Sequence, residues 1–412
     1  MDLERPPRII CLVTDRLRAA AIGSYGAAWC ETPAFDQLAS QSLLFDQVLT
    51  PAQTLAGLYR QLWQGAHPLE PAAGTANLPR LLRAAGYRTT LLTDEPQLTQ
   101  HPLAAEFDEQ VHLPAAEVTA PARRMEETQL ARLSAATLEM VSAAERADRG
   151  APRLLWIHSR GMAGPWDAPL ELRNSLLDED DPPPPQTTSV PSLVLPEDFD
   201  PDLPLGLTQA YTAQIMTLDA CLAALLDQLQ GRPLGEQTLL IVLGGRGFPL
   251  GEHRRVGAAE EILYGEMVHL PLMIRFPHGL GRLTRSDALV QPSDLFATLL
   301  DCVGQRIPAA MGSAASLLPL ARDEQPRVRD RLCLTTSSGQ LALRTAAWHA
   351  IFAESGDQVE LYTKPDDRWE FNDVASRLPD VVSGLRTALA QFQQAAQAGQ
   401  LASLPPLDES LE

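Results

Sequence analysis

A glycine-rich turn after an apolar run is the segment of the sequence that points most directly to chemistry. Residues 239–243 (LLIVL) read as a buried strand, and residues 244–247 (GGRG) and 251–253 (GEH) follow it. Open α/β sheets bind ligands where such strands end, and glycines let backbone N–H groups approach a phosphate or sulfate. Turn conformation alone also accounts for the glycines. A phosphate cradle and a purely structural loop, pinned by its Glu and His, are therefore both open interpretations.

Charged residues follow another predicted strand, at 9–14. Asp15 and Arg16 come directly after it. An aspartate at a strand end can bind a divalent cation, or it can pair internally with Arg16 or Arg18. Arg16 and Arg246 together can either neutralise Asp15 or present a fork that binds an anion. Of these two, we favour neutralisation.

Predicted strands and helices alternate along most of the chain. The strands are expected at 9–14, 87–93, 154–158 and 239–243, and helices at 78–86, 125–146 and 207–229. Another helix begins after Thr32, an N-cap residue type, with Pro33 at its first position. His158 ends a strand, where a hydrogen-bonded core histidine is commoner than a metal ligand. The alternation predicts an α/β fold with a large, mostly parallel central sheet covered by helices on both faces.

The pattern changes after about residue 325. Short strands are expected at 331–335, 341–345, 348–352 and 359–362, with a closing helix at 379–396. This order predicts a small C-terminal α+β subdomain with an antiparallel sheet. We therefore divide the chain into an α/β domain at 1–324 and a subdomain at 325–412. The acidic, proline-rich segment 178–204 is expected to be an excursion without regular structure.

Composition excludes several classes of partner. The net charge of −19 argues against nucleic acid and anionic membranes, which select basic surfaces. No apolar run is long enough to span a bilayer, and residues 9–14 are too short for a signal peptide, so a cytoplasmic location is expected. The five cysteines are scattered without a CxxC pair and predict reduced, buried thiols.

Several motifs together resemble one known family. Residues 239–253 resemble a sulfatase signature in which an apolar strand precedes T-S-D-H-G-x-x-x-G-E-H. Residues 85–89 (AGYRT), 270–277 (LPLMIRFP) and 290–295 (VQPSDL) resemble A-G-Y-R-T, V-P-L-I-I-R-x-P and V-Q-P-V-D-L. Further matches lie at 15–26, 32–45, 164–169, 211–219 and 360–372, which makes nine collinear matches. The chain is thus similar to formylglycine-type sulfatases, and the resemblance implies an alkaline-phosphatase-like fold.

The resemblance also implies where catalytic residues should be. In the family a formylglycine is made from the Cys or Ser of C/S-x-P-x-R, and Lys, His and Arg clasp the sulfate. Here Leu55 falls at the nucleophile, Gly57 at the motif proline and Tyr59 at the motif arginine. A leucine can neither be oxidised to formylglycine nor attack an ester. Asp94 and Ala163 stand at the clasp's Lys and His positions.

The implied cation site is altered in the same way. The active family uses calcium, and Asp15 matches one of its carboxylate ligands. Arg16, Gly245 and Arg246 stand at the other ligand positions. Calcium takes 6–8 oxygen ligands, and guanidinium groups repel it. We therefore expect no bound metal and no other cofactor.

These losses predict a sulfatase-like pseudoenzyme that keeps the scaffold and lacks hydrolysis. Its role would be binding, either to a sulfated or carboxylated ligand through Arg16 and Arg246 or to an active paralogue. One alternative is a divergent sulfuric-ester or phosphoester hydrolase with Thr54 or Thr14 as nucleophile. Another is a structural protein with a filled cleft. The sequence leaves the partner and the oligomeric state open.

The resemblance makes one architectural prediction. Residues far apart in the sequence should meet at the carboxyl ends of the sheet strands, with Cα atoms within about 15 Å of one another, the reach of one cleft. The residues concerned are Asp15, Leu55, Asp94, Ala163, Gly245 and Arg246.

Overall fold

The computed structural model describes residues 8–412, apart from 72–75, 116, 148–150, 258–260 and 309–311. The chain groups into two compact units. The first comprises Met1–Leu44, Gly86–Glu260 and Leu270–Arg285, and the second comprises Phe45–Ala85, Glu261–His269 and Ser286–Glu412. This division differs from the predicted boundary at residue 325. Segments before that residue join the second unit because they bond to the C-terminal sheet, as when the Thr335 N–H donates to the Pro51 carbonyl at 2.9 Å.

A mixed, mostly parallel sheet is the central feature, as the sequence predicts. It has eight strands in the order β10-β2-β9-β7-β1-β5-β3-β4. Their bounds are β1 (Arg8–Thr14), β2 (Leu43–Leu49), β3 (Arg88–Thr93), β4 (Glu109–His112), β5 (Arg153–Ser159), β7 (Thr238–Gly244), β9 (His269–Arg275) and β10 (Thr284–Val290). Strands β1, β3, β5 and β7 are those expected from the sequence. Strands β2, β4, β9 and β10 were not expected from the sequence, and β9 runs antiparallel to β7.

The register of the parallel strands brings their carboxyl ends to one edge. Thr14 of β1 pairs with Ser159 of β5 and with Gly244 of β7, and Thr93 of β3 pairs with His158 of β5. Residues that follow these strands therefore emerge together in the first unit.

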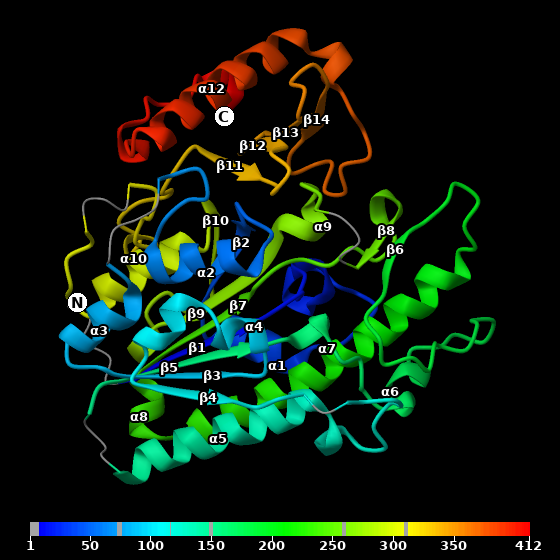
Figure 1. Cartoon of the computed structure of the whole chain (residues 1–412), viewed down its shortest axis with the longest axis vertical. Coiled ribbons are helices and arrows are strands. Elements are labelled where there is room, and N and C mark those ends of the chain that lie inside the picture. The colour runs from blue at the N-terminus through cyan, green and yellow to red at the C-terminus, as the bar shows by residue number, and fades with distance from the viewer. Residues whose placement is uncertain (1–7, 72–75, 116, 148–150, 258–260, 309–311) are drawn as a thin grey trace. The chain divides into compact units, whose positions relative to one another are not determined.

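Two long helices cover a face of the first unit's part of the sheet (Figure 1). They are α5 (Gln129–Ala147) and α7 (Asp202–Leu229), and their apolar residues share a core with Ile10, Leu155 and Leu240 of the strands. The shorter helices of this unit are α1 (Pro33–Ser40), α4 (Pro96–Thr99), α6 (Leu170–Asn174) and α8 (Pro233–Glu236).

The prediction that segment 178–204 has no regular structure is partly wrong. Strand β6 (Ser192–Val194) lies inside it and pairs antiparallel with β8 (Arg255–Gly257). Helix α7 begins at Asp202, so its first turn includes Pro204. Proline is compatible with a first helical turn because the N–H groups there have no intrahelical acceptor.

The amino end of α1 is capped from a distance. Thr32 is the N-cap residue, as predicted, but its hydroxyl makes no cap and instead accepts from the Gly23 N–H at 2.9 Å. Asp219 of α7 caps the helix, because its Oδ1 accepts from the backbone N–H groups of Ala34 and Phe35, both at 3.0 Å. This bond fixes α1 to α7.

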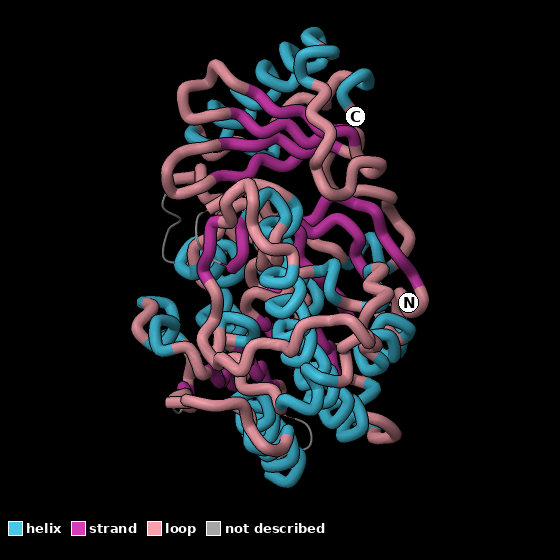
Figure 2. The backbone as a smooth tube through the Cα atoms, turned by 90° about the vertical axis from the view of Figure 1, so that its right-hand side faces the viewer, coloured by secondary structure: helices cyan, strands magenta, loops and turns pink. Residues whose placement is uncertain are grey.

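The second unit contains the predicted α+β element. Its antiparallel sheet has the order β11-β12-β13-β14, and α12 (Pro379–Gln397) lies along it, as Figure 2 shows. The strand bounds are β11 (Arg331–Thr335), β12 (Leu341–Thr345), β13 (Trp348–Phe352) and β14 (Val359–Thr363). The unit's other helices are α2 (Leu55–Gln64), α3 (Leu78–Ala84), α9 (Gly265–Val268), α10 (Ser293–Cys302) and α11 (Leu318–Ala321).

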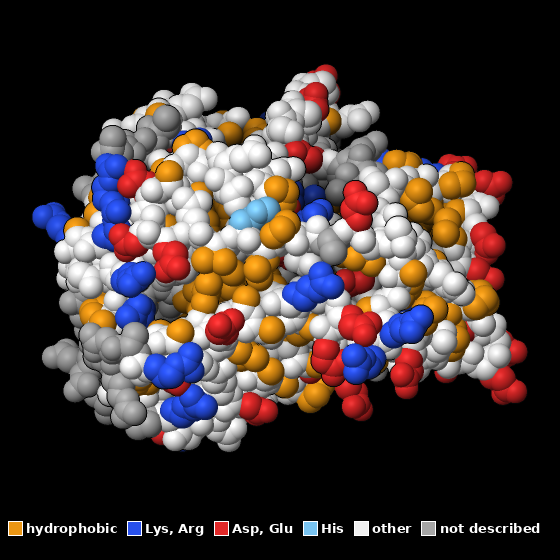
Figure 3. Space-filling model, turned by 60° about the horizontal axis from the view of Figure 1, so that its bottom comes forward, with side chains coloured by type: hydrophobic (Ala, Val, Ile, Leu, Met, Phe, Trp, Pro, Cys, Tyr) orange, Lys and Arg blue, Asp and Glu red, His pale blue; other side chains and the backbone are white. Residues whose placement is uncertain are grey.

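The cysteines agree with the expectation from composition. All five cysteines are unbridged, and each is buried except Cys221, which is half-buried. Among the described residues, no helix combines the length and apolarity needed to cross a membrane. Figure 3 shows acidic and basic side chains interspersed on one face, with Lys and Arg side chains gathered toward its left edge. That face is therefore not uniformly acidic, despite the net charge of −19.

We predict that Asp219→Ala lowers the free energy of unfolding by about 1–2 kcal/mol, the cost of losing an N-cap. Urea unfolding of the native chain and the variant measures this. Asp227→Ala, at an exposed position of the same helix, is the matched control and should change stability by no more than about 0.5 kcal/mol. Equal losses in both variants would show that the Asp219 carboxylate does not hold α1.

Candidate functional site

The candidate site lies at the carboxyl edge of the sheet in the first unit. Asp15 follows β1, Asp94 follows β3, and Gly245 and Arg246 follow β7. Ala163 ends a short 3-10 turn that begins two residues after β5. The N–H of Met162 in this turn donates to the Asp15 carbonyl at 3.0 Å. The structure thus brings together every residue of the predicted site that belongs to this unit.

An ion pair between Asp15 and Arg246 occupies the centre of this edge. Nε of Arg246 donates to Oδ1 of Asp15 at 2.8 Å, and Nη2 donates to Oδ2. The pair is thus bidentate, the geometry in which a guanidinium binds a carboxylate most strongly. The Asp15 side chain is 1% exposed and that of Arg246 is 16% exposed. This contact confirms the prediction that an arginine neutralises Asp15.

The surroundings keep Asp15 ionised. Burial by itself raises the pKa of the Asp15 carboxyl, but the charge and hydrogen bonds of Arg246, together with the charges of Arg16 and His158, lower it by more. The resulting pKa is about 2. A carboxylate in this environment stays charged at neutral pH because its counter-charge is built into the fold.

The backbone at Arg16 is bent into the left-handed region, with φ of 59°. Its N–H donates to Oδ1 of Asp15 at 3.1 Å, which gives that oxygen a second donor. The Tyr211 hydroxyl, on α7, donates to the Arg16 carbonyl at 2.8 Å and accepts from the Arg18 N–H at 3.2 Å. The Arg16 guanidinium donates to the Gly247 carbonyl at 3.3 Å. These bonds connect the end of β1 to the turn after β7.

A second ion pair pins the loop that contains Glu252. Nη2 of Arg18 lies 2.6 Å from Oε1 of Glu252, and Oε2 of Glu252 accepts from the Leu250 N–H at 2.7 Å. Phe248, between the two glycine turns, stacks on Tyr211 with ring centroids 5.1 Å apart. Glu252 therefore has the structural role proposed for it, and the loop rests on a buried aromatic cluster.

The glycines of the turn have structural reasons to be glycine. A Cβ on Gly244 would lie 2.5 Å from the Leu17 carbonyl oxygen and 2.6 Å from Cδ of Pro271. The Gly245 N–H donates to the Thr14 carbonyl at 2.8 Å, so it is not directed at a ligand. The turn conformation and close packing support the structural interpretation over a phosphate cradle.

Asp94 is a buried acid with a different setting. Its Oδ1 accepts from the Arg160 N–H at 2.7 Å, and its Oδ2 lies 3.5 Å from Nε2 of Gln129. Burial raises the pKa of Asp94 to about 6, because these hydrogen bonds offset only part of the desolvation of the charged form. His158, on the adjacent strand, is fully buried, and burial lowers its pKa to about 4. It is a neutral core histidine at neutral pH.

The nucleophile and arginine positions belong to the second unit. Leu55 begins α2, where the Thr54 hydroxyl caps the helix by accepting from the Gly57 N–H at 3.0 Å. Leu55 and Tyr59 are both buried, and the rings of Tyr59 and Trp63 lie 4.3 Å apart. The predicted convergence of Leu55 with the first unit stays a prediction.

Arg60 lies one position beyond the expected motif arginine. Its hydrogen bonds within the second unit are structural. Its Nη2 donates to the carbonyl oxygens of Glu70 and Pro71 at 2.6 Å and 2.7 Å. The guanidinium therefore fastens the segment after α2. The segment in which the nucleophile motif is expected forms helix α2.

The residues at the strand edge do not fit calcium. Both oxygens of Asp15 accept hydrogen bonds from one guanidinium, and Arg16 and Gly245 bring no side-chain oxygen. Across the described part of the chain, no group of three or more His, Cys, Asp or Glu residues is arranged to hold a metal ion. Calcium would have to displace Arg246 and find most of its 6–8 oxygen ligands elsewhere.

Sequence reasoning missed three contributors to this edge. They are the Tyr211 hydroxyl, the Arg18–Glu252 pair and the Asp94–Arg160 bond. The family motifs flagged Tyr211 and Glu252, but no local pattern indicates which residue each one contacts. Asp94 itself was singled out by the resemblance and directly follows the strand predicted at 87–93, but its hydrogen-bond partner was not.

We predict that Asp15→Asn and Arg246→Met each lower the free energy of unfolding by about 3–5 kcal/mol, because each leaves a buried charge without its partner. The double variant should lose less than the sum, since no unpaired charge remains. Urea unfolding of all four proteins measures the coupling. Arg124→Met, in an exposed pair with Glu127, is the control. Additive losses would contradict a coupled pair.

We also predict a pH dependence from Asp94. Its folded pKa of about 6 lies above the ordinary value of 3.8, so the folded chain holds this proton more tightly than the unfolded chain. Protonated Asp94 therefore stabilises the folded state at low pH. This contribution to the free energy of unfolding, at most about 3 kcal/mol, is lost as the pH rises from about 4 through 6. Asp94→Asn should remove this part of the unfolding free energy's pH slope, whereas Asp227→Asn should not. An unchanged slope in Asp94→Asn would refute the assignment.

The chain matches two protein-family models and resembles several known sulfatases in sequence. A family model described as Sulfatase matches residues 7–305, and one described as the C-terminal part of N-sulphoglucosamine sulphohydrolase matches residues 251–395. An N-acetylglucosamine-6-O-sulfatase of Bacteroides thetaiotaomicron is 29% identical over 114 residues, which cover 28% of this chain and 20% of that protein. A sulfatase of Formosa agariphila is 26% identical over 162 residues, which cover 39% and 31%. The aligned stretches thus span less than a third of these relatives.

Solved structures extend the likeness to the whole fold. The phosphonate monoester hydrolase of Agrobacterium radiobacter has a TM-score of 0.77 at 17% identity, over 95% of this chain and 96% of that one. A 2-O GAG sulfatase has a TM-score of 0.73 at 17% identity, over 95% and 93%. At such identities these structures establish the fold alone. Together with the family model that matches most of its length, they lead to one conclusion: the chain belongs to the sulfatase family.

Proposed function

We propose that this chain is a member of the sulfatase family without ester hydrolase activity, and that its role is to bind a ligand or a partner. The observation that carries the proposal is the bidentate contact of Arg246 with Asp15. A buried carboxylate with both oxygens bonded to a guanidinium is a poor cation ligand. The chemistry of the family depends on a cation that polarises the nucleophile and the leaving oxygen.

The replacement of the nucleophile supports the same proposal. Leu55 has no group to attack sulfur or phosphorus, and Tyr59 is buried against Trp63. Removing a single group that stabilises charge in the transition state slows an enzyme by about 10²–10³. Here the nucleophile, the cation ligands and the clasp residues at Asp94 and Ala163 are all replaced together. A remaining role in binding is therefore favoured over slow turnover.

A divergent hydrolase is the competing proposal. Its nucleophile would be Thr54, which caps α2 with its hydroxyl, or Thr14, which is fully buried. Neither arrangement includes a base that a described hydrogen bond joins to the hydroxyl, and nucleophilic hydroxyls need such activation. We place this alternative second for that reason.

The ligand of the proposed binding role would be a sulfated or carboxylated molecule, or the partner an active relative. The Arg246 side chain remains 16% exposed while it holds Asp15. Arg16 is more deeply buried and donates to the Gly247 carbonyl. A contact through Arg246 is therefore favoured over one through Arg16.

Hydrolysis assays test the proposal. We expect no turnover of an aryl sulfate, an aryl phosphate or an aryl phosphonate monoester above the buffer rate; the last is included because phosphonate monoester hydrolases share the fold. Leu55→Cys should not create activity, because the motif proline and arginine are also replaced. Turnover that disappears in Asp15→Ala would overturn the proposal, and turnover that disappears in Thr14→Val or Thr54→Val would identify the divergent hydrolase.

A further inference from the structure

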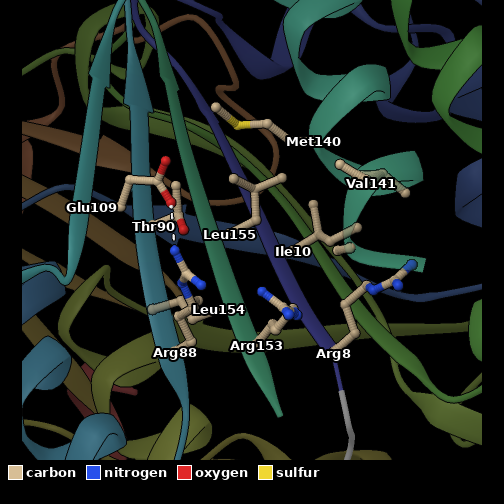
Figure 4. A pocket seen from close by; sticks show the side chains of 12 residues that line it. Arg8, Ile10, Arg88, Thr90, Glu109, Met140, Val141, Arg153, Leu154 and Leu155 are labelled. Carbon is tan, nitrogen blue, oxygen red and sulfur yellow. Dashed lines mark hydrogen bonds and ion pairs between the residues drawn. The ribbon is translucent and has the colours of Figure 1, made fainter. Parts of the chain in front are cut away.

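Three arginines stand side by side at the amino ends of neighbouring strands, at the opposite end of the sheet from Asp15. Arg153 of β5 is the direct register partner of Arg8 on β1 and of Arg88 on β3. Paired positions of neighbouring strands project from the same face of a sheet, and like charges placed directly beside each other destabilise it. Figure 4 shows the three side chains at one end of a pocket. We call them the arginine rung.

Among the described residues, two glutamates, Glu145 and Glu109, form ion pairs with the arginine rung. Glu145 of α5 lies 3.4 Å from Arg8, but it is also paired with Arg232 at 2.5 Å. Glu109 pairs with Arg88 at 3.3 Å. Among the described residues, no carboxylate forms an ion pair with Arg153, and its buried Nε has no hydrogen-bond partner. Burial lowers the pKa of Arg8, the charge and hydrogen bond of Glu145 raise it, and the charges of Arg153 and Arg232 lower it by smaller amounts.

The pocket beside the rung has one polar end and one apolar end. Its volume is about 260 Å³. The next row of the same sheet, two residues along, consists of Ile10, Leu155, Thr90 and Glu109. Ile10 and Leu155 form an apolar floor, and Thr90 and Glu109 lie at its polar side. Met140, Val141 and Ala144 of α5 line the opposite wall. A cation cluster thus adjoins a mostly aliphatic chamber (Figure 4).

We propose that this pocket binds a small amphipathic anion, with its carboxylate or sulfate head on the arginine rung and a short apolar chain between the sheet and α5. A carboxylate or a sulfate accepts two parallel hydrogen bonds from a guanidinium, and it brings a negative charge to Arg153, with which no described carboxylate forms an ion pair. Ile10, Leu155 and Val141 exclude water from the chain, which gives the favourable free energy of apolar burial. The proposal does not depend on the state of the Asp15 edge, because it uses the other end of the strands.

Calorimetric titration of the full chain with octanoate tests the proposal. We expect one saturable site for octanoate, and binding at least about tenfold weaker for acetate, which lacks the chain, and for 1-octanol, which lacks the charge. Arg153→Met should raise the octanoate Kd at least about tenfold, which is the factor that a charged hydrogen bond contributes. Ala144→Phe should abolish binding because the ring fills the chamber.

Thermal unfolding shows whether each variant is folded. Without ligand, Arg153→Met should melt at or above the temperature of the native chain, because one of three adjacent like charges is gone. Octanoate should raise the Tm of the native chain and of the control Arg124→Met, but not that of Arg153→Met or Ala144→Phe. The proposal is overturned if no saturable octanoate binding occurs, if 1-octanol binds as tightly, or if folded Arg153→Met and Ala144→Phe keep the native Kd.

Discussion

The buried ion pair between Asp15 and Arg246 is the constraint on which the carboxyl edge depends. A carboxylate that is 1% exposed must be paired, or its desolvation would cost several kcal/mol. Arg246 meets this need with two parallel hydrogen bonds, and the Arg16 N–H adds a third. Asp15 directly follows β1, Arg246 lies two residues after β7, and these two strands pair in parallel. The ion pair therefore joins the ends of two neighbouring strands and holds the turn that follows β7.

The rest of the edge is built to support that pair. Tyr211 holds the left-handed turn at Arg16 through its carbonyl, and the same hydroxyl accepts from the Arg18 N–H. Arg18 in turn bonds to Glu252, which closes the glycine loop. The described side chains thus bond to one another across this edge of the sheet. On this account, the arginines at cation-ligand positions act as replacements for the ion's charge, and the scaffold is retained for stability and binding.

The sequence predicted the central strands and the residues that follow them because apolar runs and family motifs mark both. It also predicted an arginine partner for Asp15, since a carboxylate at a strand end needs a counter-charge. Other features escaped it for physical reasons. Strand β2 contains the polar pair Asp46 and Gln47, which breaks the apolar signal, and Pro204 masked the start of α7. The Asp219 cap on α1 joins residues 185 apart in the sequence, a contact that no local pattern reveals. The arginine rung likewise becomes visible only once the register of three strands is known.

The metal content of the purified chain, measured by mass spectrometry after dialysis against calcium, tests the central claim most directly. If Arg246 has taken the place of the cation's charge, the native chain should retain calcium well below one ion per molecule. Asp15→Asn should give the same low value, because there is no site to remove. One calcium ion bound per native chain, and lost in Asp15→Asn, would show that the carboxylate is a metal ligand and that the ion pair gives way to the cation.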